Sequence, residues 1–354
     1  MPNALRPRVE WLLAFIPVSI VARFGIDNDP LTFFTAAIAI VPLAGLIGRS
    51  TDQLAIRSGP RIGGLLNATF GNVTELIIAI LLVLDDEVEI VKASLTGSIL
   101  GNLLLVLGLS FFVGGLRNEQ QEFNSEAASV HTTSLMLAVV GLLMPALFVL
   151  TTGKHGFVER EVVSGVVAGV LMVLYGAVLV FTLVTHEHLF HVSAGEQAPE
   201  WSVRASVLVL IAATVAVAFE SELLVGAMEP TLHALGLSRF FVGLILVPII
   251  GNAAEHSSAL LFALKDKVDV TLEIAVGSSI QIALFVAPAL VFISLAIGHP
   301  MNFVFSPFEV AAVGGAAVIV SAISRDGRTN WLEGAQLMAT YVIIAISFFF
   351  VRSL

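Results

Sequence analysis

The sequence has 354 residues, of which 57% are hydrophobic and only 12% are charged. An average soluble domain carries about 25% charged residues, so this composition excludes a water-soluble globule and indicates an integral membrane protein. The absence of cysteine excludes disulfide scaffolds, thiolate metal sites and cysteine nucleophiles, and the net charge of −10 argues against a nucleic-acid partner and favours cations as ligands.

Apolar windows with few charged residues recur along the chain, and most have the roughly 20 residues that a helix needs to cross a bilayer core. They predict an all-α integral membrane fold with about 11 transmembrane helices, of which the first is short enough to be tilted or interfacial. The predicted spans are residues 11–24, 31–48, 62–84, 93–116, 129–151, 162–185, 203–222, 240–264, 270–297, 306–324 and 332–351.

The distribution of basic residues predicts the orientation, because basic loops are retained in the cytoplasm. The side of the N-terminus carries Arg6, Arg8, Arg49, Arg57, Arg61, Arg117, Arg204, Lys265, Lys267, Arg325 and Arg328. The opposite side carries only Arg23, Lys92, Lys154, Arg160, Arg239 and Arg352. We therefore expect a multi-pass protein of a prokaryotic inner membrane, with the N-terminus in the cytoplasm and the C-terminus outside.

A motif in the third span recurs in the eighth. Gly71–Glu75 reads Gly-Asn-Val-Thr-Glu and Gly251–Glu255 reads Gly-Asn-Ala-Ala-Glu, and the offset of 180 residues continues without a gap to Gly97-Ser98 and Gly277-Ser278. Because the two spans are five apart, the second copy enters the membrane from the opposite face. Inverted repeats of this kind are typical of secondary transporters.

The repeat predicts the organisation of the chain. We expect an N-terminal helix in residues 1–28, a first five-helix repeat in 29–185, a cytoplasmic linker in 186–202 and a second five-helix repeat in 203–354. A weaker echo pairs Ser50–Leu54 with Glu220–Leu224. It predicts gating or mouth positions for Asp52 on the inner side and for Glu222, with Glu220, on the outer side.

The repeated motif places an acid inside each of two apolar spans, where a charged side chain costs at least about 2.5 kcal/mol. Each acid shares a helical face with the asparagine three residues earlier, and the glycine before it allows a close helix approach or a local break. The next span of each half adds polar side chains. The candidate metal ligands are Glu75, Glu255, Asn72, Asn252, Gly71, Gly251, Ser98, Ser278, Asn102 and Gln281.

Carboxylate, amide and hydroxyl oxygens together suit a hard cation such as Ca²⁺. The charge of two glutamates is neutralised either by one Ca²⁺ or by two protons, whereas an empty pair of buried anions is costly to carry through an occluded state. This arithmetic predicts obligatory exchange of Ca²⁺, as transported substrate, for H⁺ as counter-ion. It calls for no cofactor and for no enzymatic activity.

Gly71–Ala79 and Gly251–His256 resemble the two signature regions of the Ca²⁺/H⁺ antiporters, the cation/proton exchanger branch of the cation/Ca²⁺ exchanger superfamily. The resemblance implies Ca²⁺ export by alternating access, with Glu75 and Glu255 as central ligands and helices 2 and 7 as the moving gate. Related Na⁺/Ca²⁺ exchangers carry a further acid on the helix after the second motif. Residues Ser278–Ile282 contain none, which favours protons over Na⁺.

Several alternatives remain open at this stage. A Na⁺/Ca²⁺ or other cation/H⁺ exchanger would use the same scaffold, and a passive channel would show flux without coupling. Paired acids can also activate water, as in an intramembrane hydrolase, but the sequence has no His-Glu-x-x-His helix. The amide and hydroxyl side chains can equally form interhelical hydrogen bonds. The oligomeric state is left open.

Histidines offer two further hypotheses. His256 lies about 100° around the helix from Glu255 and is expected to point elsewhere, as a packing residue or a pH sensor. In the linker, His186, His188 and His191 are candidates for a regulatory metal site, although exposed loop histidines usually bind none.

Overall fold

The computed structural model describes residues 9–152, 156–190 and 199–350. These residues are almost entirely helical, and ten of the helices that they form are long and apolar enough to cross a membrane. An eleventh predicted span, 306–324, forms the shorter apolar helix Pro307–Ile323. All eleven predicted segments are thus helices, and the prediction of a multi-pass helical membrane protein is confirmed. Four residues of the charge count (Arg6, Arg8, Lys154 and Arg352), together with residues 191–198 of the linker, which include His191, lie outside the described residues.

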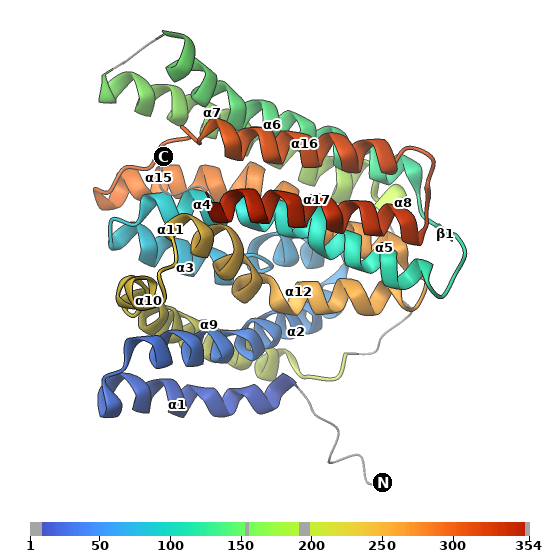
Figure 1. Cartoon of the computed structure of the whole chain (residues 1–354). Coiled ribbons are helices and arrows are strands. Elements are labelled where there is room, and N and C mark those ends of the chain that lie inside the picture. The colour runs from blue at the N-terminus through green and yellow to red at the C-terminus, as the bar shows by residue number, and fades with distance from the viewer. Residues whose placement is uncertain (1–8, 153–155, 191–198, 351–354) are drawn as a thin grey trace. The chain divides into compact units, whose positions relative to one another are not determined.

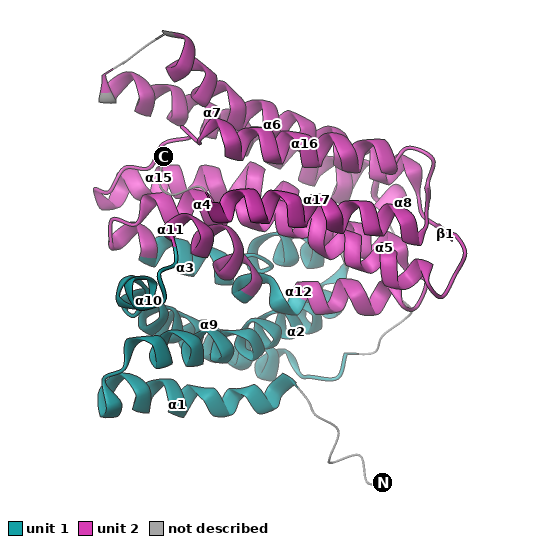
Figure 2. Cartoon of the chain, viewed as in Figure 1, with its two compact units in different colours: residues 1–81, 199–237, 250–254 teal, residues 82–198, 238–249, 255–354 magenta. Residues whose placement is uncertain are grey.

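The chain divides into two compact units, and each draws on both halves of the sequence. Unit 1 comprises residues 1–81, 199–237 and 250–254, and unit 2 comprises residues 82–198, 238–249 and 255–354 (Figure 2). The boundaries between the units therefore differ from the expected boundaries between the two sequence repeats.

Unit 1 is built on the packing of two long helices, α2 and α9 (Figure 1). Leu43 and Ile47 of α2 lie against Leu210, Ala213 and Val217 of α9, and all five side chains are buried. The leading helix α1 lies beside α2 and α9. The elements, in which η2 is a 3₁₀-helix and η3 a π-helix, are η2 (Val9–Ala14), α1 (Phe15–Val21), η3 (Ala22–Ile26), α2 (Asp29–Phe70), α3 (Val73–Leu84, as far as residue 81), α9 (Val203–Gly226) and α10 (Met228–Leu235).

Helix α2 contains a chain reversal, because Gly59 has a φ of 81° that residues with side chains rarely adopt. Residues on the two sides of Gly59 face each other. A Cβ atom at Gly63 would lie 2.9 Å from the Cβ of Ala55, and Asn67 donates a hydrogen bond to Asp52. The predicted second and third spans therefore meet at this reversal.

Unit 2 contains the remaining helices and one short antiparallel ladder between β1 and β2, in which Gln121 pairs with Thr329. Helix α5 packs on α17, and α4 packs on the π-helix η6. The elements before residue 200 are α4 (Val88–Leu100), η4 (Gly101–Val106), α5 (Leu107–Gly115), β1 (Gln121–Glu122), α6 (Ser125–Thr152), α7 (Phe157–Val180), η5 (Phe181–Thr185) and α8 (Glu187–Phe190). Those after it are α11 (Arg239–Phe241), η6 (Val242–Leu246), α12 (Val247–Ala263, whose residues 250–254 belong to unit 1), α13 (Val268–Leu272), η7 (Glu273–Gly277), α14 (Ser278–Gln281), η8 (Ile282–Val286), α15 (Ala287–Ile297), α16 (Pro307–Ile323), β2 (Arg328–Thr329) and α17 (Trp331–Phe350).

Two local features of unit 2 recur at the offset of the sequence repeat. Asp86 and Asp266, which are 180 residues apart, both adopt the left-handed conformation, with φ of 61° and 59°. The π-helical stretches η4 and η8 also fall at nearly equivalent positions, Gly101–Val106 and Ile282–Val286. The duplicated sequence thus forms the same unusual turns twice.

Candidate cation site

In unit 2, the second repeated glutamate belongs to a partly buried hydrogen-bonded cluster. Glu255 of α12 shares a side-chain hydrogen bond with Ser278, the first residue of α14. The Oε2 atom of Glu255 is buried and accepts no hydrogen bond from the described residues. A buried carboxylate oxygen without a donor is costly unless a cation or a proton satisfies it.

Asn102 and His256 extend this cluster. The Asn102 amide nitrogen donates to the hydroxyl of Ser278 at 3.2 Å, and Nε2 of His256 lies 3.1 Å from Oδ1 of Asn102. Because the amide oxygen can only accept, the imidazole is the donor in this contact. The hydroxyl of Ser278 accepts from Asn102 and so directs its own proton toward Glu255.

The expectation that His256 points away from the site is wrong. A rotation of about 100° from Glu255 does turn the side chain to another face of α12. In unit 2, however, that face meets η4, which carries Asn102, so the imidazole reaches a second residue of the candidate set.

In unit 1, the first repeated glutamate lies against the second motif. A Cβ atom at Gly251 would lie 3.1 Å from Cγ of Glu75, so the missing side chain lets Glu75 approach the α12 backbone closely. Asn72 and Asn252 are both buried, at 3% and 0% exposure. Gly71 lies instead at an irregular turn between α2, which ends at Phe70, and α3, which begins at Val73, and it keeps helical dihedral angles. Gly251 thus allows a close approach to its helix, whereas Gly71 marks a local irregularity in its own helix.

The remaining candidate ligands lie in unit 2. Ser98 is buried in α4, three residues before η4 begins at Gly101, and η4 carries Asn102. Gln281 is the last residue of α14, immediately before η8, and is partly exposed.

The three acids expected at the membrane mouths differ in exposure. Asp52 and Glu222 are exposed, whereas Glu220 is completely buried. The exposed position expected for Glu220 is therefore wrong. The helix α1 supplies the reason, because its Ser19 contacts the Glu220 carboxyl at 3.0 Å.

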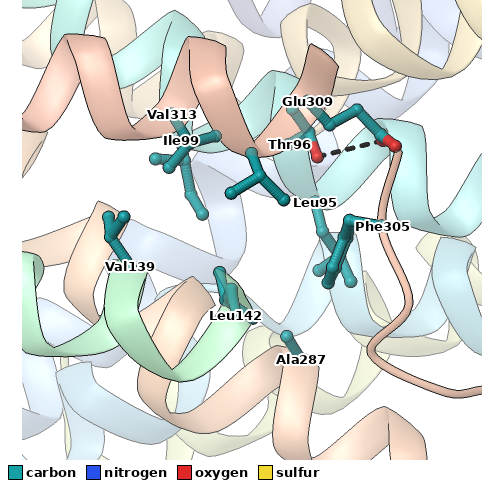
Figure 3. Close-up of a pocket in the computed structure, with 10 residues that line it drawn as sticks. Leu95, Thr96, Ile99, Val139, Leu142, Ala287, Phe305, Glu309 and Val313 are labelled. Atoms are coloured by element: carbon teal, nitrogen blue, oxygen red, sulfur yellow. Dashed lines mark hydrogen bonds between the residues drawn. The ribbon is translucent and has the colours of Figure 1, made fainter. Parts of the chain in front are cut away.

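Unit 2 also holds buried polar groups that the sequence did not single out. The buried His131 bonds to the exposed Glu273 at 2.8 Å beside a cavity of about 320 Å³, which His188 and Asp269 also line. Figure 3 shows a smaller cavity of about 20 Å³, apolar except for the hydrogen bond from Thr96 to Glu309. Glu309 also closes the capping box of α16, so we assign it a structural role there.

Within residues 9–152, 156–190 and 199–350, no group of three or more histidine and acidic side chains is arranged to hold a metal ion. The regulatory metal site predicted at His186, His188 and His191 stays a prediction, because His191 lies outside the described residues; His186 stacks on Phe181, and its ring centroid lies 6.1 Å from that of His188. A cation site formed by the described residues would draw on amide, hydroxyl or main-chain oxygens in addition to carboxylates.

Comparison with known proteins gives consistent matches over nearly the whole chain. A Ca²⁺/H⁺ antiporter of Aphanothece halophytica is 44% identical, over 96% of this chain and 95% of its own. A Ca²⁺/H⁺ antiporter of Bacillus subtilis is also 44% identical, over 97% and 99%. The solved structure of native YfkE, 41% identical, superposes with a TM-score of 0.86 and covers 97% of this chain and all of its own.

The family model described as sodium/calcium exchanger protein matches residues 29–184 and 205–350. These two segments contain both copies of the repeated motif and nearly all of the predicted spans. The chain therefore belongs to the sodium/calcium exchanger protein family, a family of membrane transporters rather than enzymes.

Proposed function

We propose that the protein exchanges Ca²⁺ for protons across a cell membrane. Two kinds of observation support this proposal. The relatives that match over nearly their full length are Ca²⁺/H⁺ antiporters. The Glu255 carboxyl is held by Ser278 and keeps a buried oxygen without a donor, as a site that alternates between a cation and a proton requires.

The exchange follows from charge balance. Glu75 and Glu255 together carry two negative charges, which one Ca²⁺ or two protons neutralise. An ion-free pair in a low-dielectric interior is unfavourable, so the protein changes conformation only when it is loaded. We propose that residues 29–185 and 203–354 act as inverted repeats in alternating access, with Asp52 and Glu222 at the two mouths and the N-terminus in the cytoplasm.

Oxygen ligands beyond the two carboxylates complete the proposed site. Asn72, Asn252, Ser98, Ser278, Asn102 and Gln281 supply amide and hydroxyl oxygens. Main-chain carbonyl oxygens near the irregular turn at Gly71 and at the close approach of Gly251 add further metal ligands. The absence of an acid in Ser278–Ile282 favours protons over Na⁺ as counter-ion.

Flux measurements in liposomes test the proposal. An imposed pH gradient is expected to drive Ca²⁺ uptake, and Glu75→Gln and Glu255→Gln are each expected to abolish it, because a neutral amide cannot exchange a proton for a cation. Glu119→Gln, at an exposed loop position, removes the same charge and is expected to leave uptake unchanged. Uptake driven by Na⁺ rather than by pH would contradict the proton coupling, and wild-type flux in either glutamate variant would contradict the ligand assignment.

A further inference from the structure

Glu220 is a buried carboxyl that the proposed exchange does not use. It lies in the last two turns of α9 within an apolar membrane-spanning helix, and its exposed fraction is 0%. An ionisable side chain in such a helix is costly and marks a candidate functional site. Its one hydrogen-bond partner among the described residues is Ser19 of α1, which also belongs to unit 1 (Figure 1).

The hydrogen atoms available at this contact indicate its charge state. The Ser19 hydroxyl has a single proton, and its oxygen lies 2.7 Å from the carbonyl oxygen of Ile16 and 3.0 Å from Oε1 of Glu220. The hydroxyl can donate this proton to only one of the two oxygens at a time, and we infer that it goes to the nearer one, the Ile16 carbonyl, which can only accept. The contact to Glu220 then needs a proton on the carboxyl, which donates it to the Ser19 oxygen.

The second carboxyl oxygen leads to the same conclusion. Oε2 of Glu220 is buried and has no hydrogen-bond partner among the residues that the structure describes. At 0% exposure, an ionised carboxylate with at most one donor would lose most of its solvation. A neutral carboxylic acid carries a much smaller penalty.

Among the described residues, the charged side chains on the elements around α9 have other partners or are exposed. On α2, Arg49 pairs with Glu200 at 2.6 Å, Arg57 donates to the main-chain oxygen of Trp201, and Arg61 is exposed. Arg23 of η3 pairs with Asp29 of α2 at 3.0 Å, and Glu229 of α10 contacts His233 at 3.1 Å. The other acids on the elements packed around α9 are Asp52, which Asn67 binds, and Glu75, which lies against Gly251. Glu222, two residues further along α9, is exposed.

We propose that Glu220 is a third proton-binding carboxyl of this protein, and that α1 docks on α9 only when Glu220 carries its proton. The carboxylate takes up one proton as the contact with Ser19 closes and returns it to water as the contact opens. Acidic conditions thus favour the docked helix, and alkaline conditions favour a separated one. This proton binds at the contact between α1 and α9. It is distinct from the two protons that the proposed exchange binds at Glu75 and Glu255.

Distance measurements between spin labels test the proposal without any Ca²⁺ flux. Because the chain has no cysteine, Val21→Cys on the last turn of α1 and Val215→Cys on α9, at positions that are 55% and 65% exposed, can each carry one label. In the reconstituted protein we expect the distance between the labels to lengthen or broaden from acidic to alkaline buffer. Glu220→Gln, which is always neutral, is expected to keep the acidic distance throughout, and Asp27→Asn, an exposed change of the same charge, is expected to behave as the parent.

A second variant keeps the proposal testable if Glu220→Gln folds poorly. Ser19→Ala removes the acceptor for the Glu220 proton and is expected to move the transition toward more acidic pH. Distances that stay constant with pH in the parent, or a Glu220→Gln protein that shifts as the parent does, would overturn the proposal. Because the readout is a distance, such a failure would leave the proposed Ca²⁺/H⁺ exchange untouched.

Discussion

At the scale of single residues, His256 supports the orientation of Ser278 through Asn102. The His256 imidazole donates to the Asn102 carbonyl and thereby fixes the amide with its nitrogen toward Ser278. Without this contact the amide is free to turn, and the Ser278 hydroxyl loses its donor. A hydrogen bond of this kind contributes about 1 kcal/mol, which corresponds to about a fivefold change in affinity.

We therefore expect His256→Leu to raise the Ca²⁺ concentration for half-maximal uptake about fivefold, and His256→Gln, which keeps a donor, to restore part of the loss. Uptake in proteoliposomes at several Ca²⁺ concentrations measures both variants. His233→Leu, in a side chain that is 81% exposed, serves as the control for loss of an imidazole. A His256→Leu protein with parental half-saturation would show that Asn102 needs no support.

The sequence predicted some residue environments well and others poorly. The echo between Ser50–Asp52 and Glu220–Glu222 is matched in burial, because the first two residues of each triplet are buried and the third is exposed. The solvent-exposed mouth position that the echo predicted for Glu220 is wrong, because α1, which lies outside the repeat, covers this side chain. A pattern within one helix cannot show which neighbour covers it.

At the scale of helices, α4 and η6 of unit 2 pack so closely that a side chain would not fit between them. A Cβ atom at Gly97 of α4 would overlap the backbone of Leu244 in η6, and one at Gly243 would lie 2.8 Å from the Cβ of Ala93. Small residues four apart, here Ala93 and Gly97, let two membrane helices pack backbone to backbone. Gly97 directly precedes Ser98, so this contact also positions a candidate ligand.

We expect Gly97→Val to destabilise the protein by roughly 1–3 kcal/mol, because the larger residue forces α4 and η6 apart. Thermal unfolding in detergent should show a lower Tm, and Ca²⁺ uptake should fall with it. Gly101→Ala is a matched control on the same helical segment, where a Cβ atom meets nothing within 4 Å. Equal unfolding temperatures for Gly97→Val and the parent would contradict the role of this contact.

Helix existence was predictable from the sequence because a bilayer fixes the length and polarity of a span. The irregularities inside the helices could not be predicted from the sequence. The reversal at Gly59, the irregular turn after Phe70 and the π-helical stretches η4 and η8 leave mean hydropathy unchanged, since a π turn only adds a residue to the helix. The repeated glycines pointed to breaks or close approaches, but only the packed structure assigns an irregular turn to Gly71 and a close approach to Gly251.

At the scale of the whole molecule, contacts within unit 2 support the alternation of sides that eleven spans require. Segments assigned to one side meet each other, as in the pairing of Gln121 with Thr329 and the hydrogen bond from Gln121 to Asp266. Segments assigned to the other side do the same, since His299 contacts Asp86 at 2.6 Å. These contacts divide the loops of unit 2 into two groups, one for each side of the membrane.

The basic residues on the side of the N-terminus predict that this side is cytoplasmic. The natural absence of cysteine makes the prediction measurable, because a single introduced thiol is then the only reactive one. In intact bacterial cells, a membrane-impermeant maleimide is expected to label Asp85→Cys and to leave Glu119→Cys unlabelled, while permeabilised cells should label both exposed positions. The reverse pattern would place the N-terminus outside and invert the proposed direction of the two mouths. Labelling of both variants in intact cells would contradict a single orientation.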